Sequence, residues 1–297
     1  MEGTYNKDSG SKGIDVHVHL RTGDRRTVTD PRLAAAQAYF KTAPQAQGVD
    51  DIASLYRRIG YRAVIFDVDQ ESQTGLKISN DEVAQAVRSY PDVFIGFASV
   101  DPWKGKAALK EIRRCATDLG LRGVKFQPLS QAFFPNDKRF GPIYELCQEL
   151  NLIVIFHTGT TGIGAGTPGG QGIHLKFGKP IPYLDDVAAD FPKLRIIGAH
   201  PSWPWQEEML AVARHKSNVY IDLSGWAPKY FPESLVQYAN TLLQDKVMFG
   251  SDFPLMNPER WLKEFADLPI RDEVRKKILH DNAVRLFDGS PEETSVR

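Results

Sequence analysis

The chain has 297 residues, 42% of them hydrophobic and 25% charged, which is enough to bury a large core in one or two domains. Lysine and arginine together number 37, as do aspartate and glutamate, so the formal net charge is zero. This balance gives no electrostatic reason to expect a nucleic acid or an anionic membrane as a partner. It favours a small-molecule substrate, either roughly neutral or an organic anion.

Cysteine use and the start of the chain indicate the compartment. Cys115 and Cys147 fall in segments with a helical pattern and have no CxxC neighbourhood, so a disulfide framework is not expected. The first residues are polar and lack the apolar run of a secretory signal. No stretch approaches the roughly 20 apolar residues that would span a bilayer. We therefore expect a cytoplasmic protein without a membrane partner, and leave a homodimer open.

Short runs rich in valine, isoleucine and phenylalanine alternate with amphipathic segments along the chain. Continuous apolar runs of this length predict strands that are covered on both faces. Eight strands are predicted, at 13–20, 62–68, 93–100, 123–127, 153–157, 195–200, 219–224 and 247–252. Helical patterns lie between them at 81–89, 106–119, 142–150, 205–215, 233–243 and 258–265, with two more helices expected in 21–60 and another in 272–287.

Strands that alternate with helices predict a parallel sheet built from βαβ units. Eight units in about 275 residues match the size of a (β/α)₈ barrel. We therefore predict an α/β protein with a TIM barrel as a single domain at 13–290, a flexible N-terminus at 1–12 and a flexible tail at 291–297. The alternative is an open doubly wound sheet, which would need no eighth strand.

Four of the seven histidines stand at the C-terminal ends of predicted strands. His17 and His19 end the first strand, His157 ends the fifth and His200 ends the sixth. In a (β/α)₈ barrel these ends meet at one face, where the active sites of this fold lie. A lone histidine at a strand end is usually structural, so the combination, and not any single residue, indicates a site.

The HxH pair has a geometric meaning. Residues i and i+2 of a strand point to the same side, so His17 and His19 should both project into the barrel mouth. Two neighbouring imidazoles suit a divalent ion. Asp252 closes the eighth predicted strand, which adjoins the first when the barrel closes, and supplies a carboxylate. The pattern predicts a metal site at the C-terminal face of the strands.

These motifs together resemble those of a known family. HVH after the first strand, FHTG after the fifth, GAHPSW after the sixth, FGSDFP after the eighth and a closing DNAVRLF resemble the amidohydrolase superfamily, over residues 13–287. The branch is similar to the one that contains aminocarboxymuconate-semialdehyde decarboxylase and related metal-dependent hydrolases. The resemblance implies that His17, His19, His157 and Asp252 bind one ion, usually zinc and sometimes manganese. It also implies that His200 is a general acid/base beside the metal-bound water.

Two reactions fit this set of residues. The first is hydrolysis of an amide, ester or lactone by an activated water, and the second is non-oxidative decarboxylation (or hydration) of an aromatic or muconate-type acid. Asp252 is expected to bind the metal and also to carry a proton in either case. The HxH pair, in place of the ExH pair of some decarboxylases of the branch, favours zinc over manganese. A decarboxylase should also grip a carboxylate, and no arginine here is a compelling candidate, so we predict a hydrolase.

Four residues are predicted to contact the substrate. Lys125 ends the fourth strand, and three interpretations compete: contact with a substrate carboxylate or oxyanion, a carbamylated bridge between two metals, or an ion pair with Asp67 or Asp69. We favour substrate contact. Arg21, just beyond HxH, is a candidate carboxylate clamp, with a solvated arginine at the rim of the barrel as the alternative. Trp203 and Trp226, in segments that follow strand ends, are candidates to line the pocket and favour a planar or hydrophobic substrate.

A long glycine-rich segment follows the fifth strand, at 158–183. Gly164, Gly166 and Gly169 match GxGxxG, but Pro168 lies inside the pattern and no helix opens directly after it. A dinucleotide-binding fingerprint needs a strand, a turn and a helix, so that interpretation is rejected. The segment is predicted to be an active-site lid.

Overall fold

The computed structural model describes residues 10–28, 30–40 and 48–288. Every pair of neighbouring strands in this part of the chain is parallel. The strands are β1 Gly13–His19, β2 Tyr61–Phe66, β3 Phe94–Gly96, β4 Ala98–Ser99, β5 Gly123–Phe126, β6 Ile153–His157, β7 Arg195–Ala199, β8 Val219–Asp222 and β9 Val247–Met248.

These strands form one closed barrel. β3 and β4 are two parts of one barrel strand, interrupted only at Phe97, so the sheets β1–β2–β3 and β4 to β9 are continuous with each other. The barrel closes between its first and last strands, where the backbone N–H of Val16 donates to the carbonyl of Phe249 at 3.0 Å and Val18 bridges to Phe253. The predicted (β/α)₈ barrel is confirmed, and the open sheet is excluded.

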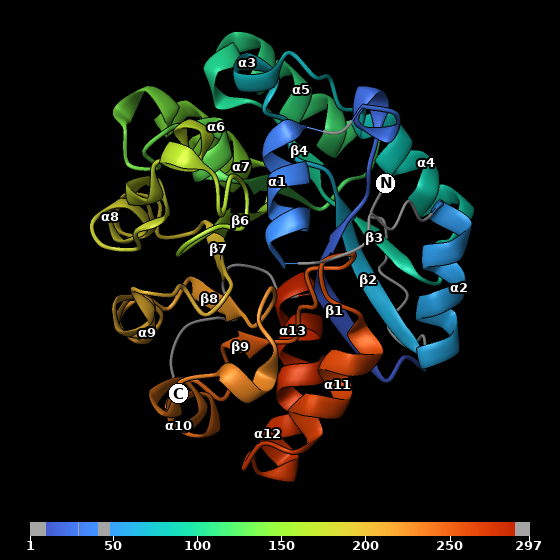
Figure 1. Ribbon diagram of the computed structural model, residues 1–297, viewed down its shortest axis with the longest axis vertical. Helices are drawn as coiled ribbons and strands as arrows, with labels where there is room; N and C mark the ends of the chain where they lie inside the picture. The colour runs from blue at the N-terminus through green and yellow to red at the C-terminus, as the bar shows by residue number, and fades with distance from the viewer. Residues whose placement is uncertain (1–9, 29, 41–47, 289–297) are drawn as a thin grey trace.

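Helices surround the strands (Figure 1). Their bounds are α1 Pro31–Phe40, α2 Val49–Ile59, α3 Glu71–Thr74, α4 Asn80–Ser89, α5 Lys106–Thr117, α6 Pro128–Gln131, α7 Gly141–Glu149, α8 Tyr183–Asp190, α9 Gln206–His215, α10 Glu233–Asn240, α11 Pro258–Ala266, α12 Asp272–Lys276 and α13 Asn282–Asp288, with a π-helical turn at Lys277–Asp281. No helix among the described residues is long and apolar enough to cross a membrane.

The interior of the barrel is a packed layer of apolar side chains. Alternate residues of the strands, such as Ile153 and Ile155 of β6, pack inward, while the residues between them pack against the helices. Leu286 and Phe287 of α13 belong to the same interior cluster. Arg122 donates to the carbonyl of Phe287 at 2.8 Å and so ties this helix to the barrel.

An irregularity in β1 sets the direction of its histidines. The register with β2 shifts between Asp15 and Val18, where the first strand carries one more residue than its partner. As a result Val16 belongs to the interior cluster while His17, its neighbour, also contacts interior side chains. An extra residue of this kind redirects the side chains that follow it.

Most of the predicted strands end one or more residues earlier in the structure. The strands at 219–224 and 247–252 stop at Asp222 and Met248, so Asp252 lies in the loop after its strand. The predicted flexible ends, 1–12 and 291–297, lie outside the described residues except for 10–12. The domain bounds at 13–290 stay a prediction.

Candidate metal centre and active site

Three of the four predicted metal ligands converge at the mouth of the barrel. Nε2 of His17 and Nε2 of His19 are 3.3 Å apart, and Oδ1 of Asp252 lies 3.3 Å from the first and 3.1 Å from the second. His17 is fully buried, whereas His19 and Asp252 are partly exposed. The three side chains therefore form a small cluster that opens toward solvent on one side.

The backbone holds Asp252 against β1. Its N–H donates to the carbonyl of His17 at 2.9 Å, and the next carbonyl, that of Phe253, accepts from the N–H of His19 at 2.8 Å. Asp252 has a φ of 67°, in the left-handed region that non-glycine residues rarely adopt. Strained backbone of this kind is concentrated at functional sites, where surrounding contacts maintain it.

The fourth predicted ligand, His157, lies beside His200 and outside that three-residue cluster. Nδ1 of His157 is 3.0 Å from Nε2 of His200. The other nitrogen of each ring faces a backbone carbonyl, at 2.8 Å for His157 and Thr160 and at 3.0 Å for His200 and Ser224. A carbonyl only accepts, so those nitrogens carry the hydrogens and the two facing nitrogens are left with lone pairs.

The surroundings keep these imidazoles neutral. Burial, together with the charge of Lys125, lowers the pKa of His157 to about 3. Burial and Lys125 also hold the pKa of His17 well below its usual value, and burial together with His157 does the same for His200. Neutral imidazole is the form that binds a metal ion or accepts a proton.

The cluster fits a divalent cation. Nδ1 of His17 faces the carboxylate of Asp222 at 3.0 Å, and a hydrogen on Nδ1 satisfies that contact; in this tautomer Nε2 presents a lone pair to the oxygen of Asp252. Two acceptors at this distance repel each other unless a cation lies between them. Ligand atoms about 2.0–2.2 Å from one ion lie roughly 3 to 3.5 Å apart, which matches the observed separations.

Lys125 lies inside the barrel next to the cluster. Its side chain is 1% exposed, its Nζ lies 3.3 Å from Nε2 of His17, and it sits over the ring of Phe66. Burial lowers its pKa to about 8. It does not take part in the ion pair considered from the sequence, because Asp67 pairs with Arg25 and Asp69 pairs with Lys104.

Arg21 is the arginine nearest in sequence to the cluster and is partly buried. Burial lowers its pKa, and the neighbouring Arg25 adds to the effect. Among the described residues no hydrogen bond or ion pair of its guanidinium is found, whereas Arg25 is held by Asp67 and by the carbonyl of Val68. Arg21 is therefore the better placed of the two to bind an external anion.

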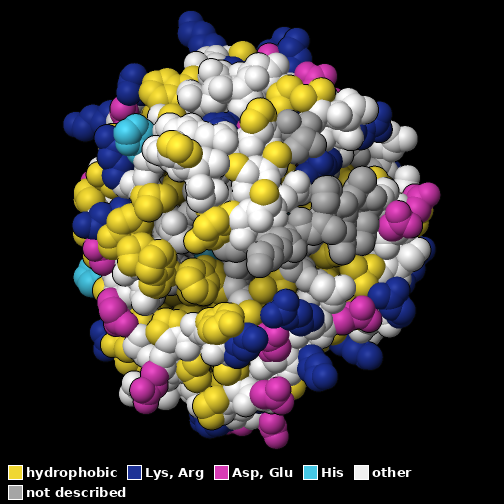
Figure 2. Space-filling model, in the orientation of Figure 1, with side chains coloured by type: hydrophobic (Ala, Val, Ile, Leu, Met, Phe, Trp, Pro, Cys, Tyr) yellow, Lys and Arg dark blue, Asp and Glu magenta, His cyan; other side chains and the backbone are white. Residues whose placement is uncertain are grey.

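Trp203 and Trp226 lie together. Their ring centroids are 6.2 Å apart, and Trp203 is 49% exposed although it is a large apolar side chain. They come from the loops after β7 and β8. Figure 2 shows hydrophobic side chains gathered on the part of the surface that covers β7, β8, α8 and α9. The pair is thus an apolar surface on the segments that follow two strand ends.

Three further residues of this region were missed from the sequence. Asp222 accepts from His17, and Ser224 contacts the rings of both His17 and His200. Gly225, with a φ of 74°, leaves no room for a side chain, because a Cβ would lie 2.7 Å from Nδ1 of His200. The signal for Asp222 was present, since it is an acid at the end of the seventh strand.

The glycine-rich segment contacts both the candidate site and α1. The carbonyl of Thr160 accepts from His157, and the N–H of Gly164 donates to the carbonyl of Arg32 at 3.0 Å. A Cβ on Gly166 would lie 2.4 Å from the ring of Tyr39. The segment therefore runs from the barrel mouth to α1, which stands in front of the strands in Figure 1.

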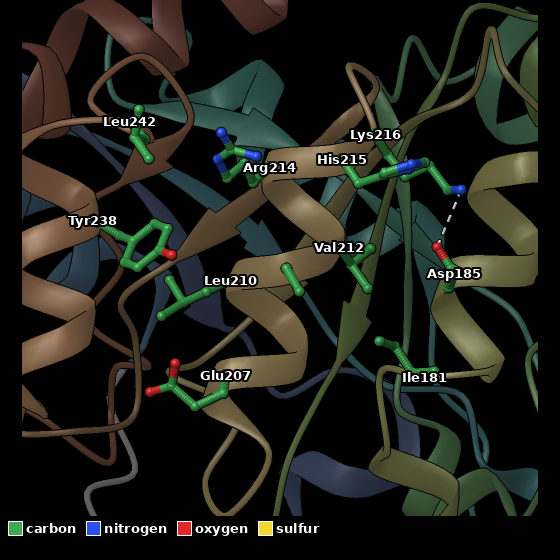
Figure 3. Close-up of a pocket in the computed structure, with 11 residues that line it drawn as sticks. Ile181, Asp185, Glu207, Leu210, Val212, Arg214, His215, Lys216, Tyr238 and Leu242 are labelled. Atoms are coloured by element: carbon green, nitrogen blue, oxygen red, sulfur yellow. Dashed lines mark ion pairs between the residues drawn. The ribbon is translucent and has the colours of Figure 1, made fainter.

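A groove of about 710 Å³ lies elsewhere, on the outside of the barrel among α8, α9 and α10 (Figure 3). Leu210 and Val212 of α9 line it, and Lys216 pairs with Asp185 at 3.2 Å. None of the predicted site residues lines this groove. It is separate from the candidate metal centre.

The family is settled by a match to the amidohydrolase family model over residues 14–289. The chain belongs to the amidohydrolase family. The resemblance found in the motifs is confirmed, and the chain is an enzyme of this superfamily.

Known relatives identify the branch. The chain is 33% identical over 245 residues to a 2-amino-3-carboxymuconate-6-semialdehyde decarboxylase of Dictyostelium discoideum, covering 71% of this chain and 66% of that protein. It is 24% identical to a γ-resorcylate decarboxylase of Rhodococcus jostii strain RHA1, covering 97% and 92%. A solved 5-carboxyvanillate decarboxylase of Novosphingobium aromaticivorans, with bound manganese, shares the fold with a TM-score of 0.69 at 18% identity, covering 95% and 98%.

These relatives correct the predicted reaction. The prediction of a hydrolase is wrong, because the relatives named above are decarboxylases and support the alternative. The error has a chemical cause. Hydrolysis and decarboxylation use the same ligands and the same acid/base residue, so the motifs carried no information that separates them.

Proposed function

We propose that this enzyme is a metal-dependent, non-oxidative decarboxylase of a small aromatic or muconate-type carboxylic acid. The relatives supply the reaction class. The observation that carries the proposal in this chain is the position of His200 and Asp252 together beside the cluster of His17 and His19. The site thus combines a place for a cation with two groups that exchange protons.

His17, His19, His157 and Asp252 would hold one divalent ion. When bound, such an ion polarises a substrate oxygen and stabilises the negative charge that develops there. Three of the ligand atoms already lie close together: Nε2 of His17, Nε2 of His19 and Oδ1 of Asp252. Nδ1 of His157 presents a lone pair nearby. Imidazole ligands favour zinc, while the solved 5-carboxyvanillate decarboxylase contains manganese, so both metals belong in the test.

Asp252 and His200 would transfer the proton that the reaction requires. Oδ1 of Asp252 faces His17 and His19, whereas Oδ2 faces Gly225, whose position also adjoins Nδ1 of His200. Asp252 thus has one oxygen toward the cation site and the other toward the acid/base residue. Because His200 is neutral, it can accept a proton at Nε2 and return it during turnover.

The reaction consumes one proton for each carbon dioxide released. A proton that the Asp252–His200 pair has taken up from solvent adds to the carbon that bears the carboxylate. The bond from that carbon to the carboxylate then breaks, and its electron pair returns to the conjugated system as carbon dioxide leaves. The protein therefore has to orient the carboxylate, supply the proton and exclude competing water.

Arg21 and Lys125 would bind the acidic and phenolic oxygens of the substrate. Arg21 is partly buried and has no hydrogen-bonding partner among the described residues, and Lys125 reaches the cluster from inside the barrel. Trp203 and Trp226 would cover the conjugated ring or chain as an apolar surface. Cation and aromatic contacts together suit a planar organic anion.

The test is turnover of a panel of hydroxybenzoic and muconate-type acids by the zinc- and manganese-loaded enzyme in deuterated water. We expect release of carbon dioxide and a product that carries one deuterium at the vacated carbon. Asp252→Asn should abolish release. A matched control is Asp185→Asn, which changes an acid of the outer groove and should leave turnover unchanged. Failure of every acid with a fully loaded enzyme would contradict the proposal.

Two expectations from the sequence stay predictions. Assembly as a homodimer is checked by analytical ultracentrifugation, and a cytoplasmic location by cell fractionation.

A further inference from the structure

The end of β8 carries a fully buried carboxylate whose two oxygens serve different partners. Oδ2 of Asp222 lies 3.0 Å from Nδ1 of His17. Oδ1 accepts from the backbone N–H of Ser224 at 2.9 Å, from the backbone N–H of His200 at 3.3 Å and from the hydroxyl of Ser224. One oxygen therefore faces a single ring nitrogen, while the other is surrounded by three donors.

This arrangement dictates which nitrogen of His17 carries the hydrogen. A carboxylate accepts hydrogen bonds only, so Nδ1 must donate and Nε2 must keep its lone pair. Nε2 is the atom that faces His19, Asp252 and Lys125. The tautomer with hydrogen on Nδ1 is thus the one that leaves Nε2 free to bind a cation.

The carboxylate, Ser224 and His17 pack closely against Gly250. A Cβ on Gly250 would lie 2.9 Å from Cβ of Ser224, 3.1 Å from Oδ1 of Asp222 and 3.1 Å from Cβ of His17. The glycine is therefore required for the close approach of these side chains. The three donors to Oδ1 and the contact of Oδ2 with His17 orient the carboxylate, and Gly250 leaves room for this close packing.

We propose that Asp222 is a positioning residue that selects the tautomer of His17 and so makes Nε2 of His17 a metal ligand. The inference rests on the proposed function, in which His17 binds the divalent ion. Asp222 does not touch the ion or the substrate. It acts through the imidazole, and it also holds the backbone of His200, whose φ of 74° is strained.

Asp222→Asn gives a sharp prediction because it changes one acceptor into a donor at constant shape. The three donors around Oδ1 require the amide oxygen at that position, which leaves the amide NH₂ facing Nδ1 of His17. His17 then has to accept at Nδ1 and carry its hydrogen on Nε2. The contact of Lys125 Nζ with Nε2 of His17, at 3.3 Å, is longer than the contact of Nδ1 with position 222, at 3.0 Å. We therefore expect the lysine side chain to move away when Nε2 carries the hydrogen.

The experiment uses histidine side-chain ¹⁵N spectra of the full metal-free protein, assigned with His17→Gln, together with zinc and manganese titrations. In the wild type we expect His17 as the Nδ1–H tautomer. In Asp222→Asn we expect the Nε2–H tautomer and a metal affinity about 10- to 100-fold weaker, the usual effect of losing such a partner. Ser224→Ala is the matched variant, since it removes the hydroxyl but keeps the carboxylate; it should keep the wild-type tautomer of His17 and bind metal within a few-fold of wild type.

The tautomer of His17 is measured without any assay of turnover. This test of Asp222 is therefore independent of the test of decarboxylation. A wild-type spectrum with hydrogen on Nε2 of His17 overturns the proposal even if Asp222→Asn does not fold. An Asp222→Asn protein that keeps the Nδ1–H tautomer, or binds metal as tightly as the wild type, overturns it as well.

Discussion

Nδ1 of His157 and Nε2 of His200 face each other at 3.0 Å, and in both rings the opposite nitrogen donates to a backbone carbonyl. Two lone pairs at this distance are unfavourable unless one of them binds a cation or accepts a proton. The simplest division assigns the cation to His157 and the proton to His200. This division agrees with the roles that the family resemblance implies, and it can be tested residue by residue.

His200→Ala should keep its metal and lose turnover by about 10² or more, as expected when a general acid/base is removed. Metal content by elemental analysis and kcat on a reactive acid are the two measurements. His215→Ala, on the exposed end of α9, is the matched control and should behave as the wild type. Loss of the metal from His200→Ala would show that His200 is a ligand.

Gly225→Ala should lose turnover by at least about 10-fold, because its Cβ would lie 2.7 Å from Nδ1 of His200 and 3.1 Å from Oδ2 of Asp252. Gly75→Ala is the matched control, with a φ of 71° and open space around the new Cβ. Both variants should lose roughly 1 kcal/mol or more of unfolding free energy from the left-handed backbone. Equal turnover in the two variants would show that space at position 225 is unimportant for the site.

The position of the candidate site could be predicted from the sequence, because its residues stand at strand ends. His17, His19, His157 and His200 close apolar runs, and parallel strands bring such ends to one face. Asp252 was also predicted, although the structure places it in the loop after β9 rather than in a strand. These residues needed only strand order and alternation, which local patterns encode.

The remainder depends on contacts that no local pattern encodes. Asp222 is visible as an acid near the end of the predicted strand 219–224, but only the folded chain shows that it faces His17. The role of Gly225 follows from the approach of His200 and Asp252, two residues that are distant in sequence. The predicted reaction was wrong because hydrolysis and decarboxylation use the same metal ligands and the same acid/base residue.

The metal-free protein should lose stability as the pH falls below about 6.5. In the unfolded chain histidine takes up protons near that pH, whereas in the fold His157 does so only near 3, and the pKa values of His17 and His200 are also lowered. The unfolded state thus binds more protons below 6.5, so the stability present above that pH is lost on acidification. The contribution of Asp15 to the pH dependence of stability has the opposite sign, because burial raises the pKa of its carboxyl to about 7. It therefore offsets part of the loss.

Thermal melting of the metal-free protein from pH 8 to pH 4 measures this effect. We expect a flat Tm above pH 7 and a fall below 6.5, and a shallower fall for His157→Gln, which removes one of the three histidines. A Tm that is independent of pH across 7 to 5 in the wild type would show that these histidines titrate normally in the fold.

The glycine-rich segment at 158–183 should act as a lid over the site. It starts directly after His157 and reaches α1 through Gly164 and Arg32. Limited proteolysis with and without a product-like acid tests this expectation, with cleavage sites mapped by mass spectrometry. We expect cuts within the segment that the acid suppresses. Cuts that are equal in both states, or a segment that resists cleavage in both, would speak against a lid.

The central claim is a single divalent ion held by His17, His19, His157 and Asp252. Elemental analysis of the purified wild type and of His17→Ala, with intact-protein mass spectrometry, tests it most directly. The account predicts one zinc or manganese ion per wild-type chain, an unmodified Lys125 and no tightly bound ion in His17→Ala, because the remaining ligands are too few. Two ions per chain with a carbamylated Lys125, or a His17→Ala protein that keeps its full metal content, would contradict it.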